Sequence, residues 1–191
     1  MVAHMTEELR EDLLARWSES HRKHHNVTHL NEMLDAIGEL ADAGLAVDRE
    51  AVELAAWFHD AIYEIGRDDN EERSAELARE LLASSPIRDE VARLVLATKT
   101  HTVSGNDINA AVLCDADLSV LGSTPLRYRA YAEAVRDEYA DIPDDVFKPA
   151  RAQVLTALLE GPVFHTEPGR SRWEERARLN VAEEILELTD A

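Results

Sequence analysis

Apolar residues recur at intervals of three and four along almost the whole chain, which is the spacing of one face of an α-helix. In residues 6–18, Leu9, Leu13 and Trp17 follow one another at intervals of four. In residues 31–44, Met33 and Ile37 carry the same pattern, which Gly44 ends. The pattern predicts further helices over residues 49–60, 71–84, 87–101, 108–122, 124–140, 143–160 and 171–190.

Residues that start or stop helices divide this pattern. Asp48 is placed to cap the helix over 49–60, and Ser85-Pro86 is typical of a helix start. Pro149 lies inside the helix over 143–160, where it predicts a kink or a break. No Asn-Gly or Asp-Gly turn joins two alternating segments, so no β-hairpin is expected. The chain is therefore predicted to be all-α, with one domain over 1–191.

Charge and composition exclude several classes of partner. The 191 residues carry a formal net charge of −19, which repels nucleic-acid polymers and anionic membranes. Binding of a small anionic substrate is still compatible with this net charge if a metal ion or local cations make the electrostatic potential positive inside one pocket. No apolar stretch is long enough to span a bilayer, and Cys114 is the only cysteine, so we expect a cytoplasmic protein without disulfides.

Two polar residues interrupt the apolar run AAWFHDAIYE at residues 55–64. His59 shares a helical face with Val52 and Ala55, so it is predicted to point toward the core. A buried histidine is often only a core residue whose ring nitrogens have hydrogen-bond partners. The adjacent Asp60 changes this interpretation, because a buried carboxylate is costly without a cation.

Other candidates have the same chemistry. Asp115 and Asp117 interrupt an apolar helix, and we expect at least one of them to bind a metal ion or the substrate. The alternative explanation is that they cap a helix or form ion pairs. His25 and His29 stand four residues apart and could share a helical face or be exposed. Imidazoles and carboxylates without a thiolate suit Mn, Fe, Co, Ni, Mg or Zn with open coordination positions.

The order of these motifs resembles the HD superfamily of metal-dependent phosphohydrolases. The resemblance rests on His29, Phe58-His59-Asp60 and the segment DADL at 115–118. The blocks HHNVTHLNEML, DNEERSAELA, LATKTH and YRAYAEAVRDEY extend it, between about residues 22 and 180, to the predicted HD-domain phosphohydrolases of bacteria. This subgroup has a Gly-Arg pair where the present chain has Pro149-Ala150-Arg151.

The resemblance implies a fold and a set of site residues. The fold would be an HD-like helical bundle with its core over about 22–160 and a C-terminal helix over about 170–188 packed on it. The implied metal ligands are His29, His59, Asp60 and Asp117, with His25 as a further candidate. Asp115 would orient an imidazole or a water, and Lys99 and His101 would bind phosphate or protonate the leaving group. Asn70, Glu71, Ser74 and Tyr63 would border the pocket, with Glu71 as a candidate proton acceptor.

Three functions are compatible with this resemblance. The leading hypothesis is a phosphohydrolase that uses one or two divalent ions, with attack by a metal-bound hydroxide on a small phosphorylated substrate such as a nucleotide. A second is a metal- or nucleotide-binding regulatory module without catalysis, and a third is a di-iron oxygenase. The helices over 124–140 and 170–188 could form a homodimer face or pack on the core.

Overall fold

Helices alone build the part of the chain that the structure describes. The computed structural model describes residues 5–190, and this range contains no strand. The predicted all-α class is therefore confirmed, while residues 1–4 and 191 of the predicted domain lie outside the described range. The elements are α1 (Glu7–Trp17), α2 (Val27–Asp42), α3 (Arg49–Phe58), α4 (Asn70–Leu81), α5 (Arg88–Ala97), α6 (Ile108–Asp117), the 3-10 helix η1 (Leu118–Gly122), α7 (Pro125–Glu138), α8 (Asp144–Leu158), α9 (Glu167–Gly169), the π-helical turn η2 (Arg170–Glu174) and α10 (Glu175–Thr189).

Side-chain caps fix several helix starts. Asp48 accepts a hydrogen bond from the Ala51 amide at the start of α3, as the sequence predicts. Thr124 caps α7 in the same way, with Pro125 at the first helical position. Gly44 follows α2 with φ +92°, a backbone conformation that glycine adopts without strain. These local signals place the helix ends close to where the sequence predicts them.

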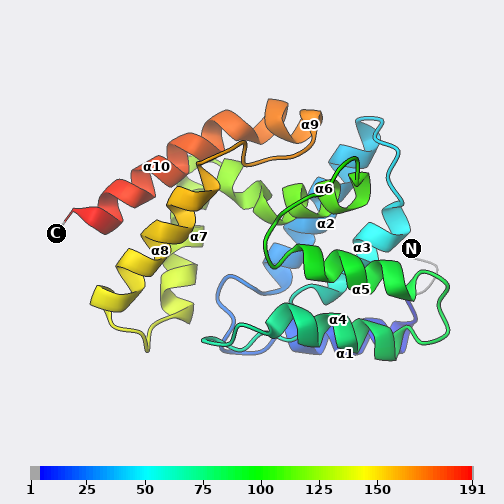
Figure 1. Cartoon of the computed structure of the whole chain (residues 1–191). Coiled ribbons are helices and arrows are strands. Elements are labelled where there is room, and N and C mark those ends of the chain that lie inside the picture. The colour runs from blue at the N-terminus through cyan, green and yellow to red at the C-terminus, as the bar shows by residue number, and fades with distance from the viewer. Residues whose placement is uncertain (1–4, 191) are drawn as a thin grey trace.

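Three helices, α2, α3 and α6, pack against one another at the centre of the molecule. The helices α4 and α5 pack against each other and against α3, and so cover one side of this centre (Figure 1). On the opposite side, Figure 1 shows α7, α8 and α10 together, and α10 packs against α8 and η1. Buried side chains from α1 to α10 belong to one continuous hydrophobic core, so α10 shares the core of the remaining helices.

Two helices have ends that differ from the sequence pattern in ways that affect the histidines. The second helix begins at Val27, four residues earlier than predicted, because Asn26 caps it through the Thr28 amide. His29 therefore lies in its first turn, while His25 precedes the helix. The third helix ends at Phe58, so His59 and Asp60 follow it as a turn and are not on its face.

Three other predicted helices also differ. The segment 108–122 consists of α6 and then the tighter η1. The fifth helix begins at Arg88, since Ser85 instead forms a local turn with the Ile87 amide. The predicted break at Pro149 is absent, and α8 runs from Asp144 to Leu158. Asp145, four residues before the proline, is exposed, so water can replace the hydrogen bond that proline cannot make.

The described residues contain no helix that combines the length and the apolar composition needed to cross a bilayer.

Candidate metal centre

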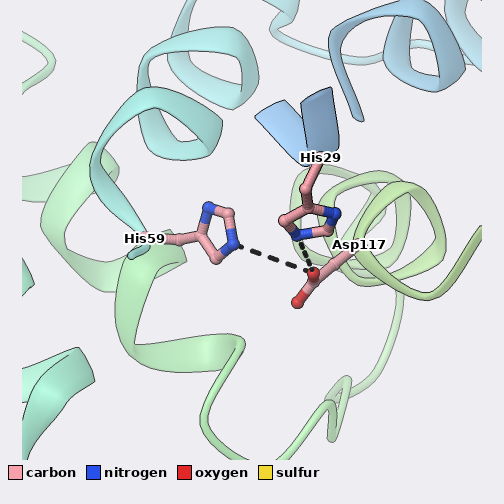
Figure 2. A group of neighbouring side chains, drawn as sticks. All are labelled: His29, His59 and Asp117. Atoms are coloured by element: carbon pink, nitrogen blue, oxygen red, sulfur yellow. Dashed lines mark hydrogen bonds and ion pairs between the residues drawn. The ribbon is translucent and has the colours of Figure 1, made fainter. Parts of the chain in front are cut away.

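Three side chains from distant parts of the chain converge at the centre of the fold. His29 comes from the first turn of α2, His59 follows α3, and Asp117 is the last residue of α6. One potential ligand atom from each lies within 4.8 Å of the other two. Figure 2 shows both imidazole rings directed at the carboxylate of Asp117. His29 Nε2 is 3.1 Å and His59 Nε2 is 3.7 Å from Asp117 Oδ1. These three residues are hereafter called the His-Asp cluster.

The two histidine rings of the cluster each have an unsatisfied nitrogen. His59 Nδ1 lies 2.9 Å from the carbonyl oxygen of Ala56, so the proton resides on Nδ1 in the neutral ring and donates to that oxygen. Nε2 lies between the carboxylates of Asp60 and Asp117 and makes no hydrogen bond, although the side chain is only 2% exposed. His29 Nδ1 is likewise buried without a partner. Unpaired buried polar atoms are costly, and a cation at His59 Nε2 would satisfy one of them.

Asp60 lies beside the cluster, and its position is fixed by a buried arginine. Asp60 Oδ2 is 3.2 Å from His59 Nε2. The Arg22 guanidinium donates to the carbonyl oxygens of Asp60 at 2.7 Å and Ala61 at 3.4 Å, and it also lies over the Trp17 ring. These bonds satisfy carbonyls beyond the end of α3 and hold the His59-Asp60 turn. Nothing in the sequence indicates this role, because Arg22 stands in a polar, histidine-rich segment.

The charges in the cluster stabilise one another. Burial would raise the pKa of Asp117, but His59 and the hydrogen bonds from His101 and His29 hold it well below its ordinary value. Burial would lower the pKa of His59, yet the carboxylates of Asp60 and Asp117 raise it to about 9. Burial likewise opposes ionisation of Asp60, but His59 lowers its pKa to about 2. The carboxylates of Asp60 and Asp117 are therefore both ionised, and a protonated histidine or a metal cation can balance their negative charge.

His101 contacts the second oxygen of Asp117. Its Nε2 lies 2.8 Å from Oδ2. The residue follows α5 and has φ +50°, the one positive φ among non-glycine residues of the described chain. This left-handed conformation is uncommon for residues with a side chain and occurs often at functional sites. The conformation turns the ring of His101 toward the cluster.

A cavity of about 320 Å³ opens beside the cluster. Its walls include His59, Asp60, His101 and Asp117, so both the imidazoles and the carboxylates reach it. Among the residues that the sequence singled out, the following also line this cavity: His25, Tyr63, Asn70 and Glu71. Its lining further includes His24, Arg67, Thr98, Tyr131, Tyr139 and Arg151.

Asn70 and Ser74 fix the loop that follows Asp60. The Asn70 side chain forms a pair of hydrogen bonds with the backbone of Glu64, at 3.0 and 3.1 Å. The Ser74 hydroxyl accepts from the Ile62 amide at 3.0 Å and donates to its carbonyl at 3.3 Å. Ser74 is buried and is absent from the cavity wall, so within the described structure its contacts are those of a loop anchor.

The structure gives Asp115 and Lys99 different surroundings from those that the resemblance implies. Asp115 is fully buried and accepts hydrogen bonds from the amides of His165 and Thr166 and from the Thr166 hydroxyl, at 2.6 to 2.9 Å. It orients the segment before α9, not a cluster imidazole. Lys99 is absent from the cavity wall, and its ammonium pairs with the carboxylate of Glu72 and the carbonyl of Asp68, each at 2.5 Å.

Glu138 is buried and binds several groups near the cavity, a role that the sequence analysis did not predict. One carboxylate oxygen accepts from the amides of Lys23, His24 and His25, at 2.8 to 2.9 Å. The other accepts from the Tyr63 hydroxyl and lies 2.7 Å from His25 Nδ1. Burial would raise the pKa of Glu138, but the His25 contacts lower it to about 2. The spacing of Glu138 from Tyr128, Tyr131 and Val135 places it on the apolar face of α7. This position is the feature of the sequence that indicates a buried carboxylate.

Arg151 was also missed as a cavity residue. Its guanidinium pairs with Glu184 at 2.9 Å and donates to the Tyr131 hydroxyl at 2.9 Å. It lines the cavity from α8, far in sequence from the cluster. In contrast, Arg73, Arg136 and Arg178 pair with acidic groups, respectively Glu64, Asp144 and Glu174.

Compared with known protein families, with curated proteins and with solved structures, the chain gives no significant match.

Proposed function

We propose that this chain is a metal-dependent phosphohydrolase of the HD type that acts on a small phosphorylated compound. The observation that carries the proposal is the buried, unpartnered Nε2 of His59, held beside His29 and the ionised Asp117 at the wall of a cavity. A bound cation would replace the Nε2 proton of His59, and an imidazole whose other nitrogen donates to a backbone carbonyl is the usual state of a histidine ligand to a metal. The donor set therefore fits a divalent cation.

The His-Asp cluster would hold the ion, with Asp60 as the neighbouring fourth ligand. Nitrogen and oxygen donors together suit Mn, Fe, Co, Ni, Mg or Zn. When bound, such an ion supplies Lewis acidity toward a phosphoryl oxygen and makes a water nucleophilic near neutral pH. The remaining steps depend on protein groups around the cavity.

Cationic and hydrogen-bonding side chains would receive the phosphate. His25, His101 and Arg151 line the cavity in a protein of net charge −19, so they create a local site for an anion inside a repulsive surface. Their positions are fixed, since Glu138 holds His25, Asp117 holds His101 and Glu184 holds Arg151. Fixed donors stabilise developing negative charge without reorganising during the reaction.

In the proposed reaction, water and a phosphate monoester give an alcohol and inorganic phosphate. A bond forms between the water oxygen and phosphorus, and the bond from phosphorus to the ester oxygen breaks. Glu71, at the first turn of α4 and on the cavity wall, would accept the proton that water loses. His25 or His101 would return a proton to the departing oxygen. A cytoplasmic location belongs to the same proposal and rests on the lone, buried Cys114.

The test combines metal content with turnover. The purified chain is analysed for bound metals and then assayed with Mn, Fe, Co, Ni, Mg and Zn against phosphate monoesters and nucleotides. We expect one or two equivalents of metal and the release of inorganic phosphate. His59→Ala should lose both, whereas His21→Ala, an exposed histidine outside the cavity wall, should keep both. Absence of phosphate release with every metal would reject the hydrolase, and tight binding of a nucleotide in its place would favour a regulatory module.

A further inference from the structure

A second cavity adjoins the first one. It has a volume of about 450 Å³ and lies between α7 and α8. His25, Tyr131, Tyr139, Arg151 and Val154 line both cavities. Because the same side chains form walls of both, the two cavities lie directly beside each other. The two volumes together have the size typical of a small-molecule site.

The second cavity differs from the first in the chemistry of its walls. Away from the shared residues it is lined by Val135, Ile142, Val146, Phe147 and Ala150. None of these side chains carries a hydrogen-bonding group, so this part of the wall is entirely apolar. It is hereafter called the apolar annex.

Two polar residues at the border of the apolar annex already have protein partners. Arg151 binds Glu184 and Tyr131, and His25 binds Glu138. A sugar or another polyhydroxylated group that entered the annex beyond this border would lose water without gaining hydrogen bonds from the apolar side chains there, which is unfavourable. An apolar group would lose nothing of this kind.

Exposed apolar surface adds to this preference. Val146 and Val154, both on α8, line the second cavity and are each 57% exposed. A ligand group that covers them removes apolar surface from water on both sides of the contact. The annex therefore favours a hydrocarbon or an aromatic ring as its occupant.

We infer that the apolar annex binds the organic group of the phosphate ester, and that this group is alkyl or aromatic and lacks several hydroxyls. The inference rests on the proposed function, because the phosphate must lie at the His-Asp cluster for its substituent to reach the annex. Arg151, at the border of both cavities, would face the ester linkage. Substrate selectivity would thus come from α7 and α8, whereas the metal ligands come from α2, α6 and the turn after α3.

Binding of phosphonates tests the inference without requiring hydrolysis. Calorimetry with the Mn-loaded protein would compare methylphosphonate, butylphosphonate, benzylphosphonate and a hydroxylated analogue of the butyl compound. Each methylene that is fully buried should tighten binding about fourfold, and the hydroxylated analogue should lose this gain. Equal affinity across the series would overturn the inference.

A matched pair of variants localises the effect. Ala150→Phe fills the apolar annex from α8 and should reduce the advantage of butylphosphonate over methylphosphonate at least tenfold. Ala157→Phe makes the same change on the same helix at an exposed position outside both walls, and should keep the advantage. An advantage that survives in Ala150→Phe as it does in Ala157→Phe would also overturn the inference.

Turnover of methyl, butyl and hexyl phosphate separates this inference from the proposed function, since their leaving alcohols have similar acidity. A value of kcat/KM that rises with chain length supports both. Hydrolysis of all three esters at one rate rejects the apolar annex but keeps the phosphohydrolase. Absence of hydrolysis, together with chain-length-dependent phosphonate binding, rejects the hydrolase and keeps the annex as a ligand site.

Discussion

Asp115 and Asp117 lie two residues apart in α6, and both interrupt an apolar helix, yet they belong to two different regions of the molecule. Asp115 points to the segment before α9, where two backbone amides and the Thr166 hydroxyl satisfy its carboxylate. Asp117 points to the opposite region, where His29, His59 and His101 surround it. One aspartate has neutral donors from its own chain, and the other faces imidazoles that include an unpartnered nitrogen.

The contrast shows that burial alone does not identify a ligand site. Asp115 is the more deeply buried of the two and is the one with a complete set of protein partners. The distinguishing property is unsatisfied hydrogen-bonding capacity next to a cavity, which the region around Asp117 has. The region around Asp115 therefore supports the fold, while the region around Asp117 is suited to a ligand.

The largest expected effect comes from Asp117→Ala, which removes the carboxylate at the centre of the His-Asp cluster. Losing a residue that only supports a metal ligand typically costs 10- to 100-fold in metal affinity, so loss of this ligand should cost more than about 100-fold. Titration of Mn into metal-free protein measures the change. Metal affinity within a fewfold of the unmodified chain would contradict the assignment of Asp117.

Asp115→Ala is the matched substitution in the other region and should affect stability in place of metal affinity. It leaves two amides and one hydroxyl without their charged acceptor, which predicts a loss of about 3 kcal/mol in the free energy of unfolding. Urea unfolding of both metal-free variants measures it. Asp117→Ala should lose less, because His59 and His101, two of its three histidine partners, border a cavity that water can enter. Equal stability losses would abolish the distinction between the two regions.

Much of the fold follows from the sequence because helical periodicity and caps are local. Asp48 and Gly44 act at the helix ends where the pattern predicts them. The pattern could not place the end of α3 before His59, because that end depends on Arg22, which binds carbonyls about 40 residues away in sequence. The early start of α2 follows from the Asn26 cap, a signal that the neighbouring histidines obscured.

The residues of the His-Asp cluster were predictable, and their surroundings less so. His59 and Asp117 stand out as polar residues among apolar ones, His29 was singled out by its spacing from His25 and by the family resemblance, and the fold brings the three together. Asp115 stands out equally, and only the three-dimensional position of Thr166 separates it from Asp117. Glu138 and Arg151 reach the cavity from helices distant in sequence, so their roles depend on helix packing, which periodicity does not determine.

Gly169→Ala sharpens the comparison from the other side of the Asp115 contact. A Cβ atom at position 169 would lie 2.4 Å from Asp115 Oδ2 and 2.9 Å from the Thr166 hydroxyl oxygen. The clash should displace this carboxylate and cost about 2 kcal/mol in the free energy of unfolding, with metal affinity unchanged. Gly161→Ala is the control, because a Cβ there meets nothing within 4 Å. If both variants unfold at the same urea concentration, the close packing around Asp115 contributes nothing measurable.

The smallest expected effect is that of Lys99→Ala, which tests whether a conspicuous charge outside both regions matters. Lys99 and His101 lie two residues apart in the LATKTH segment, and the family resemblance implies one role for both. The structure directs His101 to Asp117 and directs Lys99 to an exposed pair with Glu72. Since exposed ion pairs contribute little, kcat/KM for a phosphate ester and metal affinity should both stay within about twofold of the values of the unmodified chain.

His101→Ala, measured beside Lys99→Ala, should lower kcat/KM by at least tenfold, because it removes a donor from the cavity wall. A loss in Lys99→Ala that equals the loss in His101→Ala would mean that the lysine leaves Glu72 and reaches the substrate during the reaction.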